Sequence, residues 1–451
     1  MKKISGLLVG SLLLASSAFA QTSSKAVFDS KSKQYQIEKG AKIIVGVDND
    51  KWGNAIVELW NKAHPEYKGM VEYQYFGTAG GVDQINQKQG DAPDLCFVID
   101  SEITRGTQSV SCLEKTTAAV AKKVSQEPFF SNGNKNGKVY YIPTAYDGMS
   151  FSWNKTMMEA MGMDTTDKNN DGLPDAYDTW EEIFAWSSSL KTRPQYKGKA
   201  VNVIFPIDLD NQWAFYSSLT SAGWEIYKEG DATKPGFEKK EFLAAFDFVK
   251  AASDARISLE VNGEKTPAAS MGWRWDDYLN NEISPFGLVG TWMDVNGAKK
   301  STGSDFKFSR MPTWKGKQLT PFVKTKGWVI NGFTKYPSAT AELLRVILSK
   351  DGMQKMIDNT SYIPALKAGS PITPDYTNDE AKKEMSAAFA YNYPEPSMTL
   401  PNNTAQMAMN CYYNIQIEQS YYGVWDGTRT GKEAQDEIVK NAAAWLEQNN
   451  K

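Results

Sequence analysis

The chain has 451 residues, of which 41% are hydrophobic and 12% aromatic, and its formal net charge is −3. This apolar content is enough for large packed cores, so global disorder is excluded, and the length suits two domains or one large split domain. The acidic balance and the lack of a block of basic residues make nucleic acid and anionic membranes poor partners.

Residues 1–20 have the features of a secretory signal peptide. A short basic segment precedes an apolar stretch that begins at Ile4, and small residues close it at Ala18 and Ala20. We therefore predict cleavage after Ala20 and a free periplasmic protein, with a secreted protein as the alternative. The apolar stretch is too short for a stable membrane anchor. Residues 21–40 are polar and are predicted to form a flexible leader.

After the leader, the chain alternates strand-like and helix-like segments. Strands are predicted at 42–47, 70–75 and 94–99, with an amphipathic helix at 51–63. The third strand is almost wholly apolar, as expected for a strand that is buried on both faces. Further strands are predicted at 139–143, 149–153, 286–291 and 327–332, and further helices at 179–190, 237–254, 339–351 and 431–448. This alternation favours an α/β fold with a largely parallel sheet.

The chain contains three cysteines, Cys96, Cys112 and Cys411. Cys96 lies in a predicted strand and Cys112 ends the helix-like segment after it, so these two ends should lie side by side. We therefore predict a disulfide between Cys96 and Cys112, which an oxidising compartment permits. Three buried free thiols are the alternative.

A single histidine, His64, limits the chemistry that the chain can perform. A Ser-His-Asp triad or a Cys-His pair would depend on this one residue, which lies where a predicted helix runs into a proline turn. Zinc and iron sites that need several histidines are excluded. Histidine-dependent catalysis is therefore a weak hypothesis for this chain.

Residues 167–178 have the spacing of a calcium-binding loop. Oxygen-bearing side chains stand at positions 1, 3, 5, 9 and 12, and Gly172 stands at position 6, where the chain must turn around the ion. The loop resembles dockerin-type calcium loops. We predict one structural calcium ion, with an Asx-rich surface turn as the alternative. The predicted ligands are the side chains of Asp167, Asn169, Asp171, Asp175 and Asp178 and the carbonyl of Leu173.

Several motifs occur in an order and spacing that together point to a family. They are Asp48-Asn49-Asp50-Lys51, Ala92-Pro93-Asp94, Asn136-Gly137-Lys138-Val139-Tyr140-Tyr141-Ile142-Pro143, Thr179-Trp180-Glu181-Glu182, Gly290-Thr291-Trp292, Met311-Pro312-Thr313-Trp314 and Gly327-Trp328-Val329-Ile330-Asn331. From about residue 41 to about residue 445, the chain resembles the maltose/maltodextrin-binding family of extracellular solute-binding proteins. Each motif alone is weak, because any capped helix can begin Thr-Trp-Glu-Glu.

The resemblance implies two α/β lobes, each with a mixed, largely parallel sheet, and a ligand cleft between them. The N-terminal lobe is expected to contain residues 41–145 and 313–364. The C-terminal lobe is expected to contain residues 146–312 and 365–451, including the calcium-type loop. The chain is expected to cross the hinge near Ala145, Met311 and Pro364.

A sugar site combines aromatic platforms for ring faces with charged and amide groups for hydroxyls. The resemblance implies that Asp50 and Lys51 match an Asp-Lys pair that contacts sugar hydroxyls. It also implies that Asp147 matches a cleft Glu and that Trp292 matches a principal stacking Trp. Ligands of open α/β sheets lie beyond the carboxyl ends of strands. Trp52, Asp100, Glu102 and Trp328 lie at or beside predicted strand ends and are further candidates. The resemblance implies an acidic hydroxyl acceptor at Asp100 or Glu102, and it implies aromatic contacts at Trp213 and Tyr412.

The chain departs from the family pattern at two aromatic platforms. One platform position falls on Val98, and another falls on Cys411, beside which Tyr412 is a candidate replacement. These departures favour an oligosaccharide or glycoside ligand that need not be maltose.

These observations predict a monomeric sugar-binding protein without enzyme activity or catalytic residues. It would capture an oligosaccharide, such as a maltodextrin, and deliver it by hinge closure to the membrane permease of an ABC importer. One alternative is a secreted carbohydrate hydrolase, which would use aromatics and a carboxylate pair. A calcium-dependent adhesin, suggested by the loop, is another.

Overall fold

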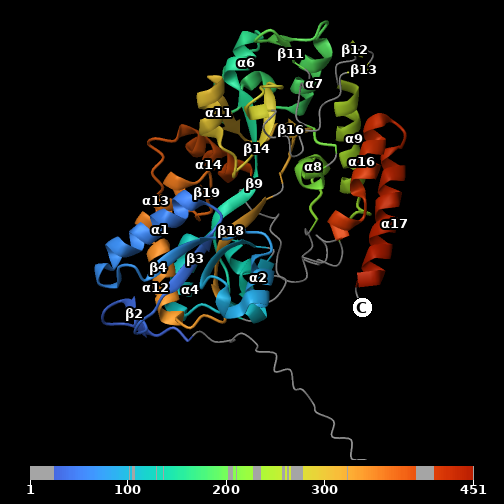
Figure 1. Cartoon of the computed structure of the whole chain (residues 1–451). Coiled ribbons are helices and arrows are strands. Elements are labelled where there is room, and N and C mark those ends of the chain that lie inside the picture. Colours follow the sequence, from blue (N-terminus) through green and yellow to red (C-terminus); the bar gives the residue numbers. More distant parts are fainter. Residues whose placement is uncertain are drawn as a thin grey trace, which may run out of the picture.

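The computed structural model describes residues 25–449 except 101, 104–106, 128, 136, 202–206, 210, 227–234, 256–259, 262–263, 266–277, 322 and 393–410. The predicted signal peptide lies outside the described residues. Figure 1 shows two lobes, one built mainly from the first part of the chain and one mainly from the middle and the end. Strands β9 (Ile142–Asn154) and β18 (Val323–Asn331) run between them.

The N-terminal lobe is built on a sheet in the order β4-β3-β5-β18-β9. Strands β3 (Ile43–Val47), β4 (Val71–Tyr75) and β5 (Leu95–Ile99) are parallel, and their carboxyl ends lie at one edge. Two apolar clusters contain residues of opposite faces of this sheet. The helices of this lobe are α1 (Asp50–Ala63), α2 (Gly81–Lys88), α4 (Lys115–Val124), α12 (Pro337–Ile347) and α13 (Lys350–Asn359).

Helix α1 begins directly after β3, which fixes the polar residues at this junction. The side chain of Asn49 accepts a hydrogen bond from the backbone N–H of Trp52 and caps the helix. Ile56, Leu59 and Trp60 follow at helical spacing and are buried against the sheet. Asp50 and Lys51 therefore stand in the exposed first turn of the helix, beside the carboxyl edge of the sheet.

Strand β9 forms the main connection between the lobes. Its first half pairs with β18 and its second half with β14 (Phe286–Gly290) and β15 (Phe306–Ser309). We expected two strands, at 139–143 and 149–153, but the backbone remains extended through the polar residues between them because β18 and β19 (Ile363–Pro364) pair along this stretch.

The C-terminal lobe packs helices and an aromatic core around the second half of β9. Trp180 contacts Phe151 and Phe248, and Trp224 stacks on Phe237 with a centroid distance of 5.6 Å. The main helices are α6 (Lys155–Ala160), α7 (Trp180–Ser189), α8 (Gln212–Leu219), α9 (Lys240–Ala255), α11 (Val295–Thr302), α14 (Glu380–Asn392), α16 (Ile417–Asp426) and α17 (Gly431–Asn449).

The lobe boundaries differ from the expected ones after Met311. The hairpin of β16 (Thr313–Trp314) and β17 (Lys317–Gln318) belongs to the C-terminal lobe, because Trp314 packs on Phe184 and Phe248 at centroid distances of 5.7 and 5.5 Å. The second crossing therefore lies at the start of β18 and not near Met311. Residues after Pro364 also return briefly to the N-terminal lobe, where Ile372 joins the core.

The second half of the predicted flexible leader is structured, which corrects that prediction. Strands β1 (Phe28–Asp29) and β2 (Gln34–Tyr35) form a hairpin, and Tyr35 is buried. The Tyr35 hydroxyl donates to Glu114 at 2.8 Å, and its backbone N–H donates to Glu342 at 3.0 Å. These contacts fasten the segment to α4 and α12 of the N-terminal lobe.

The predicted disulfide between Cys96 and Cys112 is wrong, because all three cysteines are free and buried. Cys96 pairs with Val329 on one side of β18, whereas β6 (Val110–Ser111), which precedes Cys112, pairs with its other side. Two strand spacings of ~4.8 Å place the cysteines beyond disulfide reach. The Cys96 thiol instead donates to the carbonyl of Pro93 at 3.4 Å.

Among the described strands of the main sheet, parallel pairing is confined to β3 with β4 and β3 with β5, a smaller share than we expected. The strands that connect the lobes pair antiparallel. No helix in the described part of the chain is both long and apolar enough to cross a bilayer.

Candidate functional site

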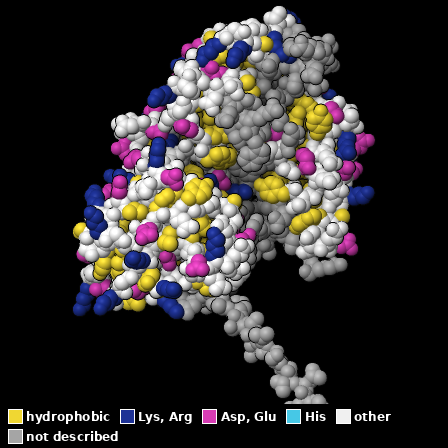
Figure 2. Space-filling view, in the orientation of Figure 1, with side chains coloured by type: hydrophobic (Ala, Val, Ile, Leu, Met, Phe, Trp, Pro, Cys, Tyr) yellow, Lys and Arg dark blue, Asp and Glu magenta, His cyan; other side chains and the backbone are white. Residues whose placement is uncertain are grey.

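A pocket of about 520 Å³ lies between the two lobes. Its lining from the N-terminal lobe is the start of α1, with Asp50 and Lys51, and the end of α13. Its lining from the C-terminal lobe is the start of α11 and the start of α14. The surface is hollowed where the lobes meet (Figure 2). The lining residues are Asn49, Asp50, Lys51, Met293, Asp294, Val295, Asn296, Asp358, Asn359, Thr360, Ser361, Asp379, Ala381, Lys382 and Met385.

Lys326 is the centre of a charged cluster beside this pocket. Its ammonium lies 3.8 Å from Asp48 Oδ2 and 3.7 Å from Asp147 Oδ1, and it donates to the hydroxyl of Tyr362 at 3.0 Å. The Tyr362 hydroxyl in turn donates to Asp48 Oδ2 at 2.5 Å. Asp48 and Tyr362 are next in sequence to pocket-lining residues. The cluster thus joins the end of β3 to the strands that connect the lobes.

Two carboxylates at this edge present oxygens that need a hydrogen-bond donor. Asp48 Oδ1 and Asp100 Oδ1 are buried and have no hydrogen-bond partner among the described residues. The other oxygen of Asp100 accepts from the backbone N–H of Thr325 at 2.8 Å and from its hydroxyl at 3.3 Å. An unsatisfied buried acceptor is costly, so a hydroxyl-rich ligand that donates to these oxygens would be stabilised.

Burial raises the pKa of Asp100 to about 6, although the hydrogen bonds from Thr325 and the charge of Lys324 lower it. The folded carboxyl thus holds its proton more tightly than the unfolded one. Its stabilising contribution is present below about pH 4 and is lost as the pH rises to about 6. In the wild type, ionisation of Asp100 should lower the free energy of unfolding by about 2 kcal/mol between pH 4 and pH 7, and Asp100→Asn should lack this decrease. Urea unfolding at a series of pH values measures the difference.

The control for this titration is Asp254→Asn, because Asp254 is 66% exposed and pairs with Lys250 on the same helix. That variant should follow the wild-type pH profile. Parallel profiles for the wild type and Asp100→Asn would show that Asp100 has an ordinary pKa.

Three of the predicted aromatic contacts are core residues instead, which corrects those predictions. Trp52 and Trp328 are buried in the N-terminal lobe, where their rings lie 5.4 Å apart. Tyr412 is buried in the C-terminal lobe, and its hydroxyl donates to the carbonyl of Gln212. Each side chain points into its lobe because the helix or strand that carries it packs on that face.

Glu102 is also a structural residue and not a cleft acceptor. It is 1% exposed, and its carboxylate accepts hydrogen bonds from the backbone N–H groups of Gly80 and Val82 at 3.0 and 3.2 Å. These groups belong to the first turn of α2, where a negative charge complements the helix dipole. This contact corrects the prediction that Glu102 binds ligand.

Trp292 lies at the junction of the lobes. It is partly buried and packs against the cores of both lobes. A Cβ on Gly290 would lie 2.5 Å from the indole, so glycine at that position allows the ring to fold back on the strand. The next residues, Met293 to Asn296, line the pocket. The side chain of Trp213 lies outside the described residues, so its predicted ligand contact stays a prediction.

The sequence reasoning missed Lys324, Lys326 and Tyr362. The two lysines alternate along β18, which otherwise has the apolar composition of a buried strand. Lysine is almost never fully buried without a partner. The Val-Lys-Thr-Lys-Gly segment was therefore a signal that could have indicated a buried charged cluster.

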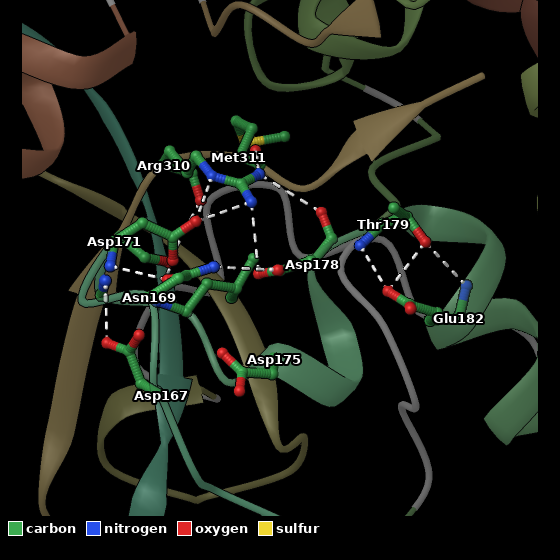
Figure 3. A network of polar contacts seen from close by, with 12 residues as sticks. Asp167, Asn169, Asp171, Asp175, Asp178, Thr179, Glu182, Arg310 and Met311 are labelled. Atoms are coloured by element: carbon green, nitrogen blue, oxygen red, sulfur yellow. Dashed lines mark hydrogen bonds and ion pairs between the residues drawn. The ribbon is translucent and has the colours of Figure 1, made fainter. Parts of the chain in front are cut away.

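An arginine from outside the calcium-type loop pairs with it, which the spacing did not predict (Figure 3). Arg310 Nη2 lies 2.7 Å from Asp171 Oδ2 and 3.2 Å from Asp178 Oδ1. Burial and the neighbouring Asp171 carboxylate raise the pKa of Asp178 to about 6, while Arg310 lowers it. Gly172 has φ of +86°, which only glycine adopts readily, so the turn of the loop is as predicted.

The loop side chains fit the chemistry of calcium but are not gathered into a cage. In the described residues, no group of three or more His, Cys, Asp or Glu is arranged to hold a metal ion. Asp167 Oδ2 accepts from the backbone N–H of Gly172, and Asp175 Oδ1 accepts from that of Lys168, both at 3.0 Å. Asp167 Oδ1 is buried without a hydrogen-bond partner. The donor set therefore has one oxygen that a cation would satisfy.

Comparison with known proteins identifies the family. The bacterial extracellular solute-binding protein family matches residues 55–384, more than half of the chain, and the protein belongs to this family. Its fold is similar to that of maltodextrin-binding protein MalE1 from L. casei BL23, at 16% identity and a TM-score of 0.66 over 91% of this chain and all of that one.

Two further solved structures share this fold. A cyclo/maltodextrin-binding protein complexed with maltotetraose has 17% identity and a TM-score of 0.66, over 90% of this chain and 98% of that one. The maltose-binding periplasmic protein MalE from Listeria monocytogenes, in complex with maltose, has 16% identity and a TM-score of 0.68, over 91% and 99%. The predicted two-lobed α/β architecture is therefore confirmed.

Proposed function

We propose that this solute-binding protein captures a sugar, an oligosaccharide such as a maltodextrin, in the pocket between its lobes. The observation that carries the proposal is the pocket itself, because its lining includes carboxylates, amides and lysines from both lobes. Sugar hydroxyls need donors and acceptors in fixed directions, which such groups supply. Three structural relatives bear names that refer to maltose or maltodextrin, which supports the same ligand class.

The two-sided pocket also suggests the mechanism. Asp50 and Lys51 belong to the N-terminal lobe, and Asp294 and Asn296 belong to the C-terminal lobe. A ligand that contacts both sets binds the closed arrangement more tightly than the open one, so it shifts the population toward closure. We propose that an ABC permease recognises the closed form, and that the chain reaches the periplasm after cleavage behind Ala20.

The test of this function is thermal unfolding of the mature protein with a panel of glycans. The panel runs from monosaccharides to maltodextrins and xylo-, cello- and manno-oligosaccharides. A ligand at about 100 times its dissociation constant should add roughly 2.7 kcal/mol of stability and raise the unfolding midpoint. A shift for one glycan class, with no product formed, supports a sugar-binding protein. Release of new reducing ends would favour the hydrolase alternative, and no shift for any glycan would contradict a sugar ligand.

We further propose that residues 167–178 bind one structural calcium ion. The loop carries four aspartates, Asp167, Asp171, Asp175 and Asp178, and the last of these and Asp171 pair with the guanidinium of Arg310. These five side chains carry a net charge of −3 when ionised. A divalent cation would offset most of this charge and give Asp167 Oδ1 a partner. The loop lies directly before α7, so the ion would brace the start of that helix.

A further inference from the structure

Tyr75 is 63% exposed although it ends a strand of the main sheet. It pairs with Val47 of β3, the residue directly before Asp48, so it lies at the carboxyl edge of the sheet. Val27, Tyr67 and Tyr422 are also large and exposed, but none of the three lies in a strand at this edge. An exposed aromatic ring at this edge, beside the strand that leads into the pocket-lining residues Asn49 and Asp50, requires an explanation.

The exposure of Tyr75 follows from where α1 begins. Successive side chains of a strand point to opposite faces, so Tyr73 and Tyr75 share one face of β4. Helix α1 covers Tyr73, because a Cβ on Gly53 would lie 2.1 Å from the Tyr73 ring and the Tyr73 hydroxyl donates to Asp50 at 2.7 Å. Because α1 starts at Asp50, it does not extend over the side chain of Tyr75.

The backbone at Tyr75 is held firmly. The backbone N–H of the next residue, Phe76, donates to the carbonyl of Val47 at 2.9 Å, and the Phe76 side chain is buried. A ring on such a support loses little conformational entropy when it binds a ligand. The strand end that carries the Tyr75 ring is thus ordered before a ligand binds.

The strand end that carries Tyr75 adjoins polar groups of the site. Burial and the carboxylate of Asp50 raise the pKa of Tyr73, and Tyr75 adds to this effect. Burial and Asp48 raise the pKa of Tyr362, to which Tyr75 again contributes. Tyr75 pairs with Val47, so its strand end adjoins Asp48 of the charged cluster, and Tyr73, two residues earlier, donates to Asp50.

The position at which the family resemblance led us to look for an aromatic platform in this lobe cannot provide one. Val98 occupies it and is fully buried. A Cβ on Gly81 would lie 2.5 Å from Val98 Cγ1, so Val98 packs tightly on the start of α2. An aromatic platform on this lobe would therefore have to come from another residue.

We propose that Tyr75 is the aromatic platform of the N-terminal lobe, on which a pyranose ring of the ligand stacks while polar groups at the start of α1 contact its hydroxyls. The apolar C–H face of a pyranose matches the electron-rich face of an aromatic ring. The inference rests on the proposed function, because it assigns a subsite to the same sugar ligand.

The experiment compares Tyr75→Ala with Tyr75→Phe by isothermal titration. The probe is maltotetraose, or the panel glycan that stabilises the wild type most. Tyr75→Ala should bind roughly fivefold to tenfold more weakly, whereas Tyr75→Phe, which keeps the ring, should stay within about twofold of wild type. The exposed Tyr67, at the far end of α1, provides the control Tyr67→Ala, which should bind as wild type does.

Thermal unfolding without ligand separates binding from folding, and Tyr75→Ala should unfold at the wild-type midpoint because its ring is exposed. If the wild type binds a glycan and Tyr75→Ala binds it equally well, the stacking inference is overturned and the proposed function stands. Equal weakening by Ala and Phe would assign the effect to the hydroxyl and would overturn stacking. If the wild type binds no glycan, the proposed function fails, and the subsite fails with it.

Discussion

Replacing Lys326 with methionine is expected to lower the free energy of unfolding by about 3 kcal/mol. The Lys326 side chain is 9% exposed, and it faces Asp48 and Asp147 at 3.8 and 3.7 Å. Methionine fills a similar volume but removes the charge, so two largely buried carboxylates lose their counter-charge. Breaking a buried ion pair in this way is costly because the remaining charge stays desolvated. Urea unfolding at pH 7 measures the effect.

The same variant should bind glycan at least about tenfold more weakly, since Lys326 positions Asp48 and Asp147 beside the pocket. Lys326→Arg keeps the charge and should recover much of the stability. The matched control is Lys62→Met, because Lys62 is 80% exposed and its pairing with Asp351 at 3.9 Å lies on the surface. A surface pair contributes at most about 1 kcal/mol. If Lys326→Met costs no more than Lys62→Met, the cluster is not a structural element of the hinge.

The sequence predicted where the site lies better than it predicted which side chains face it. The carboxyl ends of β3 and β5 were identified from the strand pattern, and polar residues of the pocket begin directly after β3. The direction of each side chain depends on what packs above the strand. Trp52 and Trp328 adjoin this edge in sequence, yet both point into the core beneath α1.

The buried lysines of β18 are site residues that the sequence did not predict. The sequence pattern predicted a strand only at 327–332, so Lys324 and Lys326 fell outside it, whereas the strand of the structure begins at Val323. The pairing of β18 with both β9 and β5 encloses that strand on two sides, so Lys326 is buried among carboxylates from distant segments. Contacts separated by hundreds of residues leave no periodic signal in one sequence.

The predicted hinge crossing near Met311 is wrong for a related reason. The segment after Met311 resembles the beginning of a crossing because it contains a proline and a turn. Trp314 nevertheless packs between α7 and α9, and the burial of this large apolar ring places the segment in the C-terminal lobe. A boundary between lobes is set by which core buries the next large side chain.

Replacing Arg310 with methionine is expected to lower the free energy of unfolding by about 3 kcal/mol when calcium is chelated. Arg310 and Asp171 have side chains that are each 10% exposed, and the two groups lie 2.7 Å apart. The guanidinium also donates to the backbone carbonyl of Asp178 at 3.2 Å, so it links the loop to the end of β15. Its loss removes the counter-charge that pairs with Asp171 and Asp178.

Saturating calcium should reduce this loss, because a divalent cation replaces the charge that the guanidinium supplied. In the wild type, removal of calcium by a chelator should lower the unfolding midpoint by several degrees. The control Lys315→Met removes an exposed pairing with Asp247 on the same lobe and should respond to calcium as the wild type does. If calcium changes the stability of neither the wild type nor Arg310→Met, the loop is a turn held by Arg310 alone, and the calcium proposal is wrong.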